Sequence, residues 1–205
     1  MDKYANFSDL QGEEVEGVDF RIHLRHGGSG IAIVAPHGGK IERGTLPLAN
    51  AIAGTDHSYY SFEGIKSSIR ANRILHLTSN NFDEPRARSL VSKCKTVVTI
   101  HGAKGMYAAV YAGGRDMELR RIVLGALKQA GFDAKDDPSP SRQGRGASNI
   151  CNSGLTAQGL QLELTLGLRK SMFRPIQDGQ GWATTEIFTQ FVEVMRRTLD
   201  DLSEL

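Results

Sequence analysis

The sequence has few of the features that mark secreted, membrane-spanning or nucleic-acid-binding proteins. Its two cysteines, Cys94 and Cys151, are too few for a disulfide scaffold and suit a reducing compartment. No apolar run approaches the roughly 18 residues that a membrane-spanning helix needs. The polar N-terminal stretch, residues 1–17, lacks the basic start and apolar centre of a signal peptide. We therefore expect cytoplasmic synthesis, with release on host lysis as an open route, and no membrane partner.

Neither sign of charge dominates the composition. The net charge is +2, which does not favour a nucleic-acid partner, because such domains concentrate Lys and Arg on one face. A modest enrichment of cations occurs in the last third of the chain, at Arg142, Arg145, Arg169, Lys170 and Arg174. These side chains form either a solvated surface or a groove for an anionic substrate. In the second case Arg145 and Arg169 are candidate substrate-binding residues.

The hydrophobic pattern predicts a single α/β domain that spans residues 1–205. Short apolar runs alternate with longer helical stretches, which is typical of a mixed central sheet with helices on both faces. Strands are expected at 19–25, 31–35, 58–62, 73–78, 96–100, 108–112 and 160–166, the first two as a hairpin. Helices are expected at 45–53, 84–93, 116–130 and 182–202, with Asp83 as the cap of the second.

One long segment, at about 136–159, shows no period and is rich in Pro, Gly, Ser and Asn. A loop of this length inside a compact domain is usually functional or disordered. We expect it to lie near the site.

Two buried strands end in the same dipeptide, His-Gly. The segments are IAIVAPHGG, which contains His37, and TVVTIHGA, which contains His101. Ligands of open α/β sheets bind just beyond the carboxyl ends of the strands. Neighbouring strands would therefore bring the two imidazoles together, and the glycines permit the chain to turn away.

Glu42 follows His37 by five residues, so its loop can fold back and present a carboxylate beside the imidazole. Two histidines and one carboxylate, with a fourth position left open, form a known catalytic zinc set. The alternative is that both histidines are packed in the core and Glu42 is a solvated loop charge.

Glu163 lies in the alternating segment LQLELTL, where the leucines take one face and the polar residues the other. A carboxylate in mid-strand is costly to bury unless it is paired or faces a polar cavity. Beside the metal strands it would act as the general base for the attacking water. A sheet edge that faces water is the equal alternative.

Three further residues are weaker candidates. Asn81 follows the strand predicted at 73–78 and would line the crevice, whereas His76 within that strand is expected to be packed or hydrogen-bonded. Arg115 follows two glycines at the end of the strand predicted at 108–112. It would bind a substrate carboxylate or stabilise an oxyanion, with a surface ion pair as the alternative.

Several motifs together carry a family resemblance. They are VAPHGGKIERGT, SYYSFEGIK, LHLTSNNFDEP, VVTIHGAKG, YAGGRD and QLELTLGLR. In their order, from about Tyr4 to Phe191, the chain resembles the phage-type poly-γ-glutamate hydrolases. That resemblance implies a zinc-carboxypeptidase-like fold, a Zn cofactor and a poly-γ-glutamate or γ-glutamyl peptide substrate. It assigns the metal to His37, Glu42 and His101, and the catalytic carboxylate to Glu163. We expect a monomer.

One departure limits what can be transferred from the wider carboxypeptidase pattern. In those enzymes two residues separate the first His from the Glu, whereas four do so here. The rival functions are hydrolysis of another amide, such as a peptidoglycan stem or an N-acyl amino acid, and a non-catalytic binding module.

Overall fold

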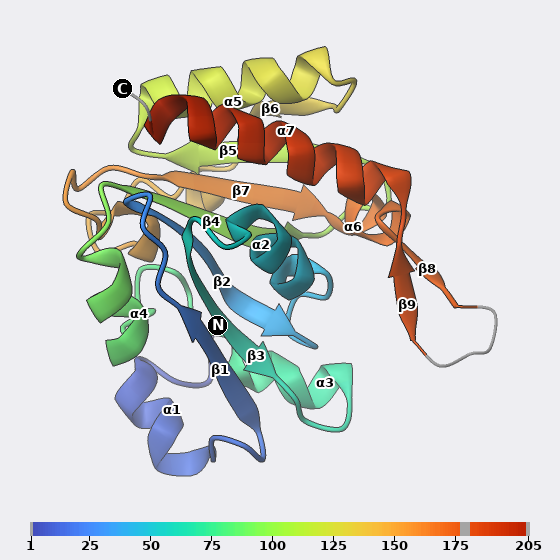
Figure 1. The fold of residues 1–205 in the computed structure, drawn as a ribbon. Helices are drawn as coiled ribbons and strands as arrows, with labels where there is room; N and C mark the ends of the chain where they lie inside the picture. Colours follow the sequence, from blue (N-terminus) through green and yellow to red (C-terminus); the bar gives the residue numbers. More distant parts are fainter. Residues whose placement is uncertain (1, 177–180, 204–205) are drawn as a thin grey trace.

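Four parallel strands form the centre of a seven-stranded sheet in the computed structural model, which describes residues 2–176 and 181–203 (Figure 1). The strands are β1 (Phe20–Arg25), β2 (Ile31–Gly39), β3 (Ser58–Gly64), β4 (Thr96–Ala103), β5 (Val110–Gly114), β6 (Ala134–Asp136) and β7 (Leu160–Thr165). Their order is β1-β3-β2-β4-β7-β5-β6. The parallel strands are β3, β2, β4 and β7, while β1 and β5 run antiparallel to their neighbours β3 and β7. The carboxyl ends of β2, β4 and β7 therefore share one edge.

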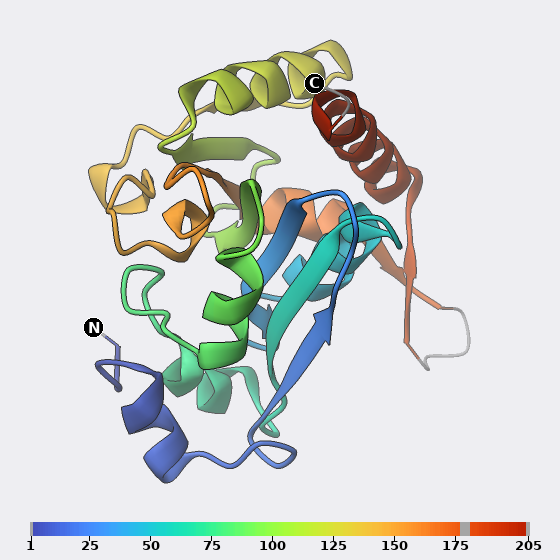
Figure 2. The ribbon, with the colours of Figure 1, turned by 60° about the vertical axis from the view of Figure 1, so that its left-hand side comes forward.

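Helices cover both sides of the sheet (Figures 1 and 2). One side, called here the α7 face, packs against α2 (Thr45–Ala53), α5 (Met117–Gln129) and α7 (Glu186–Ser203). The other side, the α4 face, packs against α1 (Phe7–Glu13) and α4 (Pro85–Val91). The remaining elements are short: α3 (Ile69–Asn72), α6 (Leu166–Ser171), the 3-10 turns η1 (Arg73–Leu75), η2 (Pro140–Arg142) and η3 (Ile150–Asn152), and the hairpin of β8 (Phe173–Pro175) and β9 (Trp182–Thr184). Within the described residues, no helix is both long and apolar enough to cross a membrane.

Alternation along the strands divides the side chains between two buried clusters. In β4, Val98 and Ile100 join the cluster on the α7 face, whereas Val97 joins the one on the α4 face. In β7 the leucines face α7, which leaves Gln161 and Glu163 on the α4 face. His101 and Glu163 are direct partners across β4 and β7. Both side chains therefore lie on the same face of the sheet.

The predicted single-domain α/β fold is confirmed, but three of the expected elements are wrong. Residues 73–78 contain a 3-10 turn and no sheet strand: Leu75 and Leu77 are buried against the α4 face, so their alternation reflects one-sided burial without strand pairing. The expected hairpin does not form, because β3 lies between β1 and β2. The last helix begins at Glu186, since 182–184 pair as β9.

The cap of α4 also differs from the prediction. Glu84, not Asp83, accepts the hydrogen bond from the backbone N–H of Ala87. Asp83 instead accepts from the backbone N–H of Phe7 and so fastens the start of α1.

The segment between β6 and β7 is irregular apart from η2 and η3, as its composition predicts. Figure 2 shows it folded over the same side of the sheet as α4. The guanidinium of Arg88 donates to the backbone oxygen of Ser148, and Ile150 donates its backbone N–H to Ser79. The segment is thus held against the chain that follows η1.

Candidate active site

A β-bulge in β2 decides which way His37 points. The pairing of β2 with β3 shifts between Ala35 and Gly38, so that β2 contains one extra residue there. Ile33 and Ala35 face α7, and regular alternation would send His37 the same way. The bulge turns its ring to the α4 face, where it contacts Phe82 and His101. Pro36, which has no N–H for a sheet ladder, occupies the bulge, where that deficit is tolerated.

The three predicted metal ligands converge on one point. Nδ1 of His37 lies 3.2 Å from Nδ1 of His101, and Oε2 of Glu42 lies 3.4 Å from the first and 3.8 Å from the second. Tetrahedral zinc with ligands at about 2.0–2.2 Å separates its donor atoms by roughly 3.3–3.5 Å. The donor set and its spacing therefore fit a zinc ion.

Neighbouring groups orient all three donors. Nε2 of His37 is 2.7 Å from the carbonyl oxygen of Leu77, which fixes the ring and directs Nδ1 toward the other donors. Nε2 of His101 is 3.3 Å from Oγ of Ser79. The backbone N–H of Gly102 donates to Oε2 of Glu42 over 2.8 Å. The site is thus held from outside as metal-binding histidines and carboxylates usually are.

The charges of the donors suit a divalent cation. Burial opposes ionisation of Glu42, but the interactions with His37, His101 and the backbone N–H of Gly102 together outweigh it and lower the pKa of the carboxyl to about 2. Burial, together with the nearby His37, lowers the pKa of His101 to about 3. Burial would also lower the pKa of His37, but the Glu42 carboxylate outweighs it and raises that pKa. At neutral pH the metal-free site therefore offers an anionic carboxylate at Glu42 and a neutral imidazole at His101, and a cation would displace the proton that His37 holds more tightly than a free imidazole does.

Arg169 fastens this site and does not face a substrate. It is only 7% exposed, and its nitrogens donate to the backbone oxygens of Leu164, Ala103 and Arg43. These oxygens belong to the ends of β7 and β4 and to the residue after Glu42. A Cβ on Gly102 would lie 2.6 Å from Cζ of Arg169, which explains a glycine after His101. Three of its five N–H donors are thus used inside the protein, which favours this structural role over the predicted contact with substrate.

Glu163 lies beside the metal donors as predicted. It is 8% exposed and is the cross-strand partner of His101. Gln161 donates to its Oε1 over 3.1 Å. Burial, with a smaller contribution from the Glu42 carboxylate, raises the pKa of Glu163 to about 8. A buried carboxyl that titrates near neutrality is suited to proton transfer.

His76 is a site residue that sequence reasoning missed. Its ring stacks on that of His37 with 4.1 Å between centroids, and its Nδ1 is 2.8 Å from Oδ1 of Asp2. His37, Glu42 and His76 also offer ligand atoms within 4.8 Å of one another. The set with His101 is more compact, at 3.2–3.8 Å, and therefore fits a zinc ion better. His76 reaches His37 only because the chain that follows η1 packs against β2, and no local sequence pattern predicts that contact.

Arg115 lies away from the metal donors. Because β5 runs antiparallel to β7, its carboxyl end pairs with the start of β7: Gly114 is opposite Leu160, and Tyr111 is opposite Glu163. Arg115 is exposed beyond that end. The antiparallel direction of β5 thus favours the alternative of a surface side chain over the predicted contact with substrate.

Asn81 and Arg145 remain predictions for substrate contacts. Asn81 is exposed and follows the segment in which Leu77 and Ser79 contact the two histidines. Arg145 is exposed in the long loop, which approaches Asn80 so closely that a Cβ on Gly146 would lie 2.6 Å from its Oδ1.

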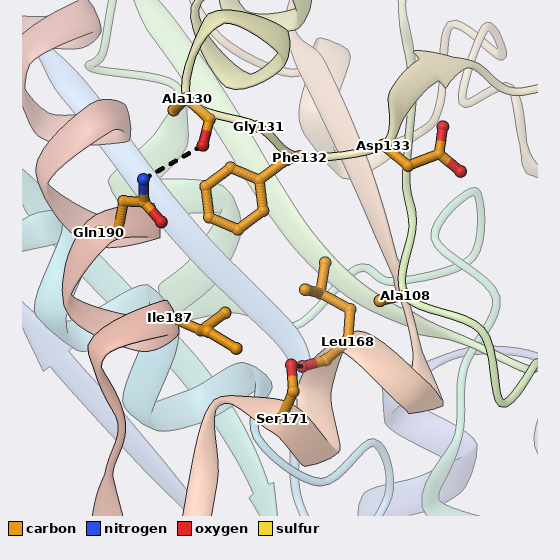
Figure 3. Close-up of a pocket in the computed structure, with 9 residues that line it drawn as sticks. All are labelled: Ala108, Ala130, Gly131, Phe132, Asp133, Leu168, Ser171, Ile187 and Gln190. Atoms are coloured by element: carbon orange, nitrogen blue, oxygen red, sulfur yellow. Dashed lines mark hydrogen bonds between the residues drawn. The ribbon is translucent and has the colours of Figure 1, made fainter.

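A separate hollow of about 220 Å³ lies between the end of α5, α6 and the start of α7 (Figure 3). Its polar groups are occupied: Gln190 donates to the backbone oxygen of Ala130, and Ser171 donates to that of Leu168. Phe132 and Leu168 belong to the core on the α7 face. The hollow is thus on the opposite face of the sheet from Glu163 and the histidines, and it is not part of their site.

The sheet and the site at its carboxyl edge define a class, the single-domain α/β proteins with an amidohydrolase-like fold. The structure of N-formylglutamate amidohydrolase from Ralstonia eutropha JMP134 shares this fold, with a TM-score of 0.51, 12% sequence identity and 91% and 97% of the two chains covered. That likeness extends to the fold alone.

Within this class the chain belongs to the poly-γ-glutamate hydrolase family, whose model matches residues 4–194. The structure of a bacteriophage poly-γ-glutamate hydrolase matches with a TM-score of 0.90 and 28% identity over 98% of each chain. The Bacillus subtilis (strain 168) protein YndL is 34% identical over 203 residues, which are 97% of this chain and 78% of YndL. A zinc-free structure of YndL matches with a TM-score of 0.90 over 98% and 99% of the chains, at 33% identity.

Proposed function

We propose that this chain is a zinc-dependent hydrolase of γ-glutamyl amide bonds and that it degrades poly-γ-glutamate. The observation that carries the proposal is the convergence of His37, Glu42 and His101, within 3.2–3.8 Å of one another, with His101 on the strand next to that of Glu163. A monomer suffices for this reaction, because one chain supplies all four residues. The family supports the substrate, and the description of the related YndL structure as zinc-free supports the metal.

When bound, a zinc ion supplies Lewis acidity that polarises the scissile carbonyl and makes water a better nucleophile. Glu163 removes a proton from the attacking water and later delivers it to the leaving nitrogen, so that the amide becomes a carboxylate and an amine. Burial raises the pKa of Glu163 to about 8 in the metal-free protein, and a divalent cation beside it would lower that pKa and favour the carboxylate that takes up the proton. Gln161, by donating to Oε1, holds the carboxyl group in one orientation.

The proposal is tested by incubating the protein with poly-γ-glutamate, with and without a chelator, and sizing the products. We expect shortening of the polymer that the chelator abolishes and that added zinc restores. A parallel panel of muramyl-peptide and N-acyl amino acid substrates tests the other amides. Cleavage of one of these, with poly-γ-glutamate left intact, would contradict the proposed substrate. Cleavage that persists after complete zinc removal would contradict the proposed metal.

A further inference from the structure

A group of three side chains, called here the Arg142 cluster, lies beside Glu163 on the α4 face. It consists of Arg142, Tyr111 and Tyr107. Tyr111 is the direct cross-strand partner of Glu163, so the two side chains are on the same face. Cζ of Arg142 lies 5.5 Å from the centroid of the Tyr111 ring, and the hydroxyl oxygens of the two tyrosines are 3.0 Å apart. The cluster is therefore next to the carboxyl group that we assign to proton transfer.

Arg142 is held from two directions. Its Nε and Nη2 donate to Oδ2 and Oδ1 of Asp137 over 2.9 and 3.0 Å, and the Asp137 side chain is fully buried. The backbone oxygen of Arg142 accepts from Nε2 of Gln161, which also donates to Oε1 of Glu163. One side chain thus links the position of Arg142 to that of Glu163. A guanidinium fixed in this way loses little conformational freedom when it binds a ligand.

The edge of the Arg142 guanidinium that faces away from Asp137, called here its outer edge, is open. Arginine has five N–H donors, and the bonds to Asp137 use one on Nε and one on Nη2. Within the described residues, no acceptor is in hydrogen-bond contact with Nη1, and the side chain is 39% exposed. The outer edge matches the two oxygens of a carboxylate. Only one tyrosine hydroxyl can donate to the other, so the pair keeps one O–H for a further acceptor.

The order of the strands indicates in which direction a bound substrate extends across the site. Across β2, β4, β7 and β5 the residues follow as His37, His101, Glu163 and Tyr111. Adjacent strands are about 4.8 Å apart, so the Arg142 cluster lies one strand beyond Glu163 on the side away from the metal donors. Because Glu163 delivers its proton to the leaving nitrogen, the unit that leaves as the amine extends toward the cluster. In a γ-linked chain, the carbon bonded to that nitrogen bears a free α-carboxylate.

We propose that Arg142 binds this α-carboxylate and is a residue that selects γ-linked over α-linked glutamyl chains. The inference rests on the proposed function. In an α-linked chain the same carbon bears a neutral amide. That amide offers the paired N–H donors of the guanidinium only one oxygen and no charge. The neighbouring tyrosines complete the carboxylate site with a hydroxyl donor and an aromatic surface for the guanidinium.

Two substrates that differ in one group test the proposal. One is a γ-glutamyl dipeptide with a free α-carboxylate on the leaving unit, and the other carries a carboxamide there. We expect the native protein to prefer the carboxylate about 10- to 100-fold in kcat/KM, as charge-assisted hydrogen bonds allow. Arg142→Met should remove the preference by raising KM for the carboxylate substrate alone. Arg142→Lys keeps the positive charge but cannot bind a carboxylate through two parallel N–H groups, so it should retain part of the preference.

The matched control is Arg121→Met. Arg121 makes the same kind of bidentate pair, with Glu118, but lies exposed on α5. It should behave as the native protein with both substrates. A merely structural role for Arg142 would lower the rates with both substrates together, and a preference that persists in Arg142→Met and Arg142→Lys would overturn the proposal.

A binding measurement separates this inference from the proposed function. In the zinc-loaded Glu163→Gln protein, calorimetry with the two dipeptides should show tighter binding of the carboxylate form, and adding Arg142→Met should abolish the difference. If the native protein cleaves γ-glutamyl bonds but this difference is absent, the role of Arg142 fails alone. If the native protein cleaves no γ-glutamyl substrate, the proposed function fails, and Arg142 with it.

Discussion

The two carboxyl groups of the site have opposite properties because their neighbours differ. Glu42 lies against two imidazoles and accepts a backbone N–H, so its pKa falls to about 2 despite burial. Glu163 is buried and lies near the Glu42 carboxylate, and its pKa rises to about 8. Such a separation assigns the roles of a pair of carboxyl groups. This difference supports the proposed roles, in which Glu42 is an anionic ligand for the metal and Glu163 is the group that exchanges a proton.

The role of Glu163 is tested by Glu163→Gln. The amide keeps the shape of the side chain but cannot accept the proton, so we expect kcat to fall roughly 10²- to 10⁴-fold. Zinc content should stay at the native level, because Glu163 is not a ligand in this account. Kinetics on poly-γ-glutamate and metal analysis of the same preparation provide both readouts. Turnover within a fewfold of the native rate would rule out the general-base role.

At this scale the sequence predicts residues whose local pattern is repeated and misses those that depend on distant pairing. His37 and His101 share a strand-His-Gly motif, which is why they could be found. His76 and Arg142 carry no such motif: the first stacks on a ring 39 positions earlier, and the second reaches Glu163 through Gln161. The sequence predicts Arg115 near the site from its place at a strand end, but it does not show that β5 runs antiparallel to β7.

Among the elements, the bulge in β2 and the loop after it build the metal site. The bulge turns His37 toward His101, and the loop returns Glu42 to the same point. Thr45 Oγ1 donates to the backbone oxygen of Glu42, and Arg169 donates to that of Arg43. These bonds tie the loop to the start of α2 and to the ends of β4 and β7. The alternation rule alone predicts the wrong face for His37. Pro36 is compatible with a bulge, but the sequence does not show that the pairing with β3 shifts by one residue there.

Arg169→Met tests the structural role of this arginine. Two buried carbonyl groups and one partly buried one lose a charged donor, so we expect the free energy of unfolding of the metal-free protein to fall by about 1–3 kcal/mol or more. Zinc affinity should fall as well, because the Glu42 loop is released. Urea denaturation and zinc titration measure the two effects, with Arg121→Met as the control. Native stability combined with a raised KM would instead restore Arg169 as a substrate ligand.

The sequence predicts the strands and helices that have strong local periodicity. It does not predict the segments whose structure depends on whether another strand lies beside them. The runs in β2, β4 and β7 and the apolar stripe of α5 are visible in the sequence. Residues 73–78 alternate like a strand but find no neighbour in the sheet. The segment 182–184 lies within the helix predicted at 182–202 yet pairs with β8. In both cases the tertiary environment outweighs local propensity.

For the whole molecule, the raised pKa of Glu163 predicts a dependence of stability on pH. Its folded pKa of about 8 exceeds the ordinary value of 4.5, so between these values the native state holds a proton that the unfolded chain has lost. The free energy of unfolding therefore loses the contribution of this group as pH rises through that window. In the metal-free state, Glu163→Gln should become increasingly more stable than the native sequence from pH 5 to about 8.

Denaturation curves of both metal-free proteins across this range give the difference at each pH. Comparing the two proteins cancels the titration of groups that do not interact with Glu163, whereas His37 does interact with it and contributes to the difference. A stability difference that stays constant with pH would contradict the raised pKa.

The central claim is that one zinc ion is held by His37, Glu42 and His101. Anomalous diffraction at the zinc absorption edge, from crystals of the zinc-loaded protein, tests it most directly. We predict one strong peak per chain, at about 2.0–2.2 Å from both Nδ1 atoms and from a carboxylate oxygen of Glu42. A peak that is bound by His76 in place of His101, or no peak at this edge of the sheet, would contradict it.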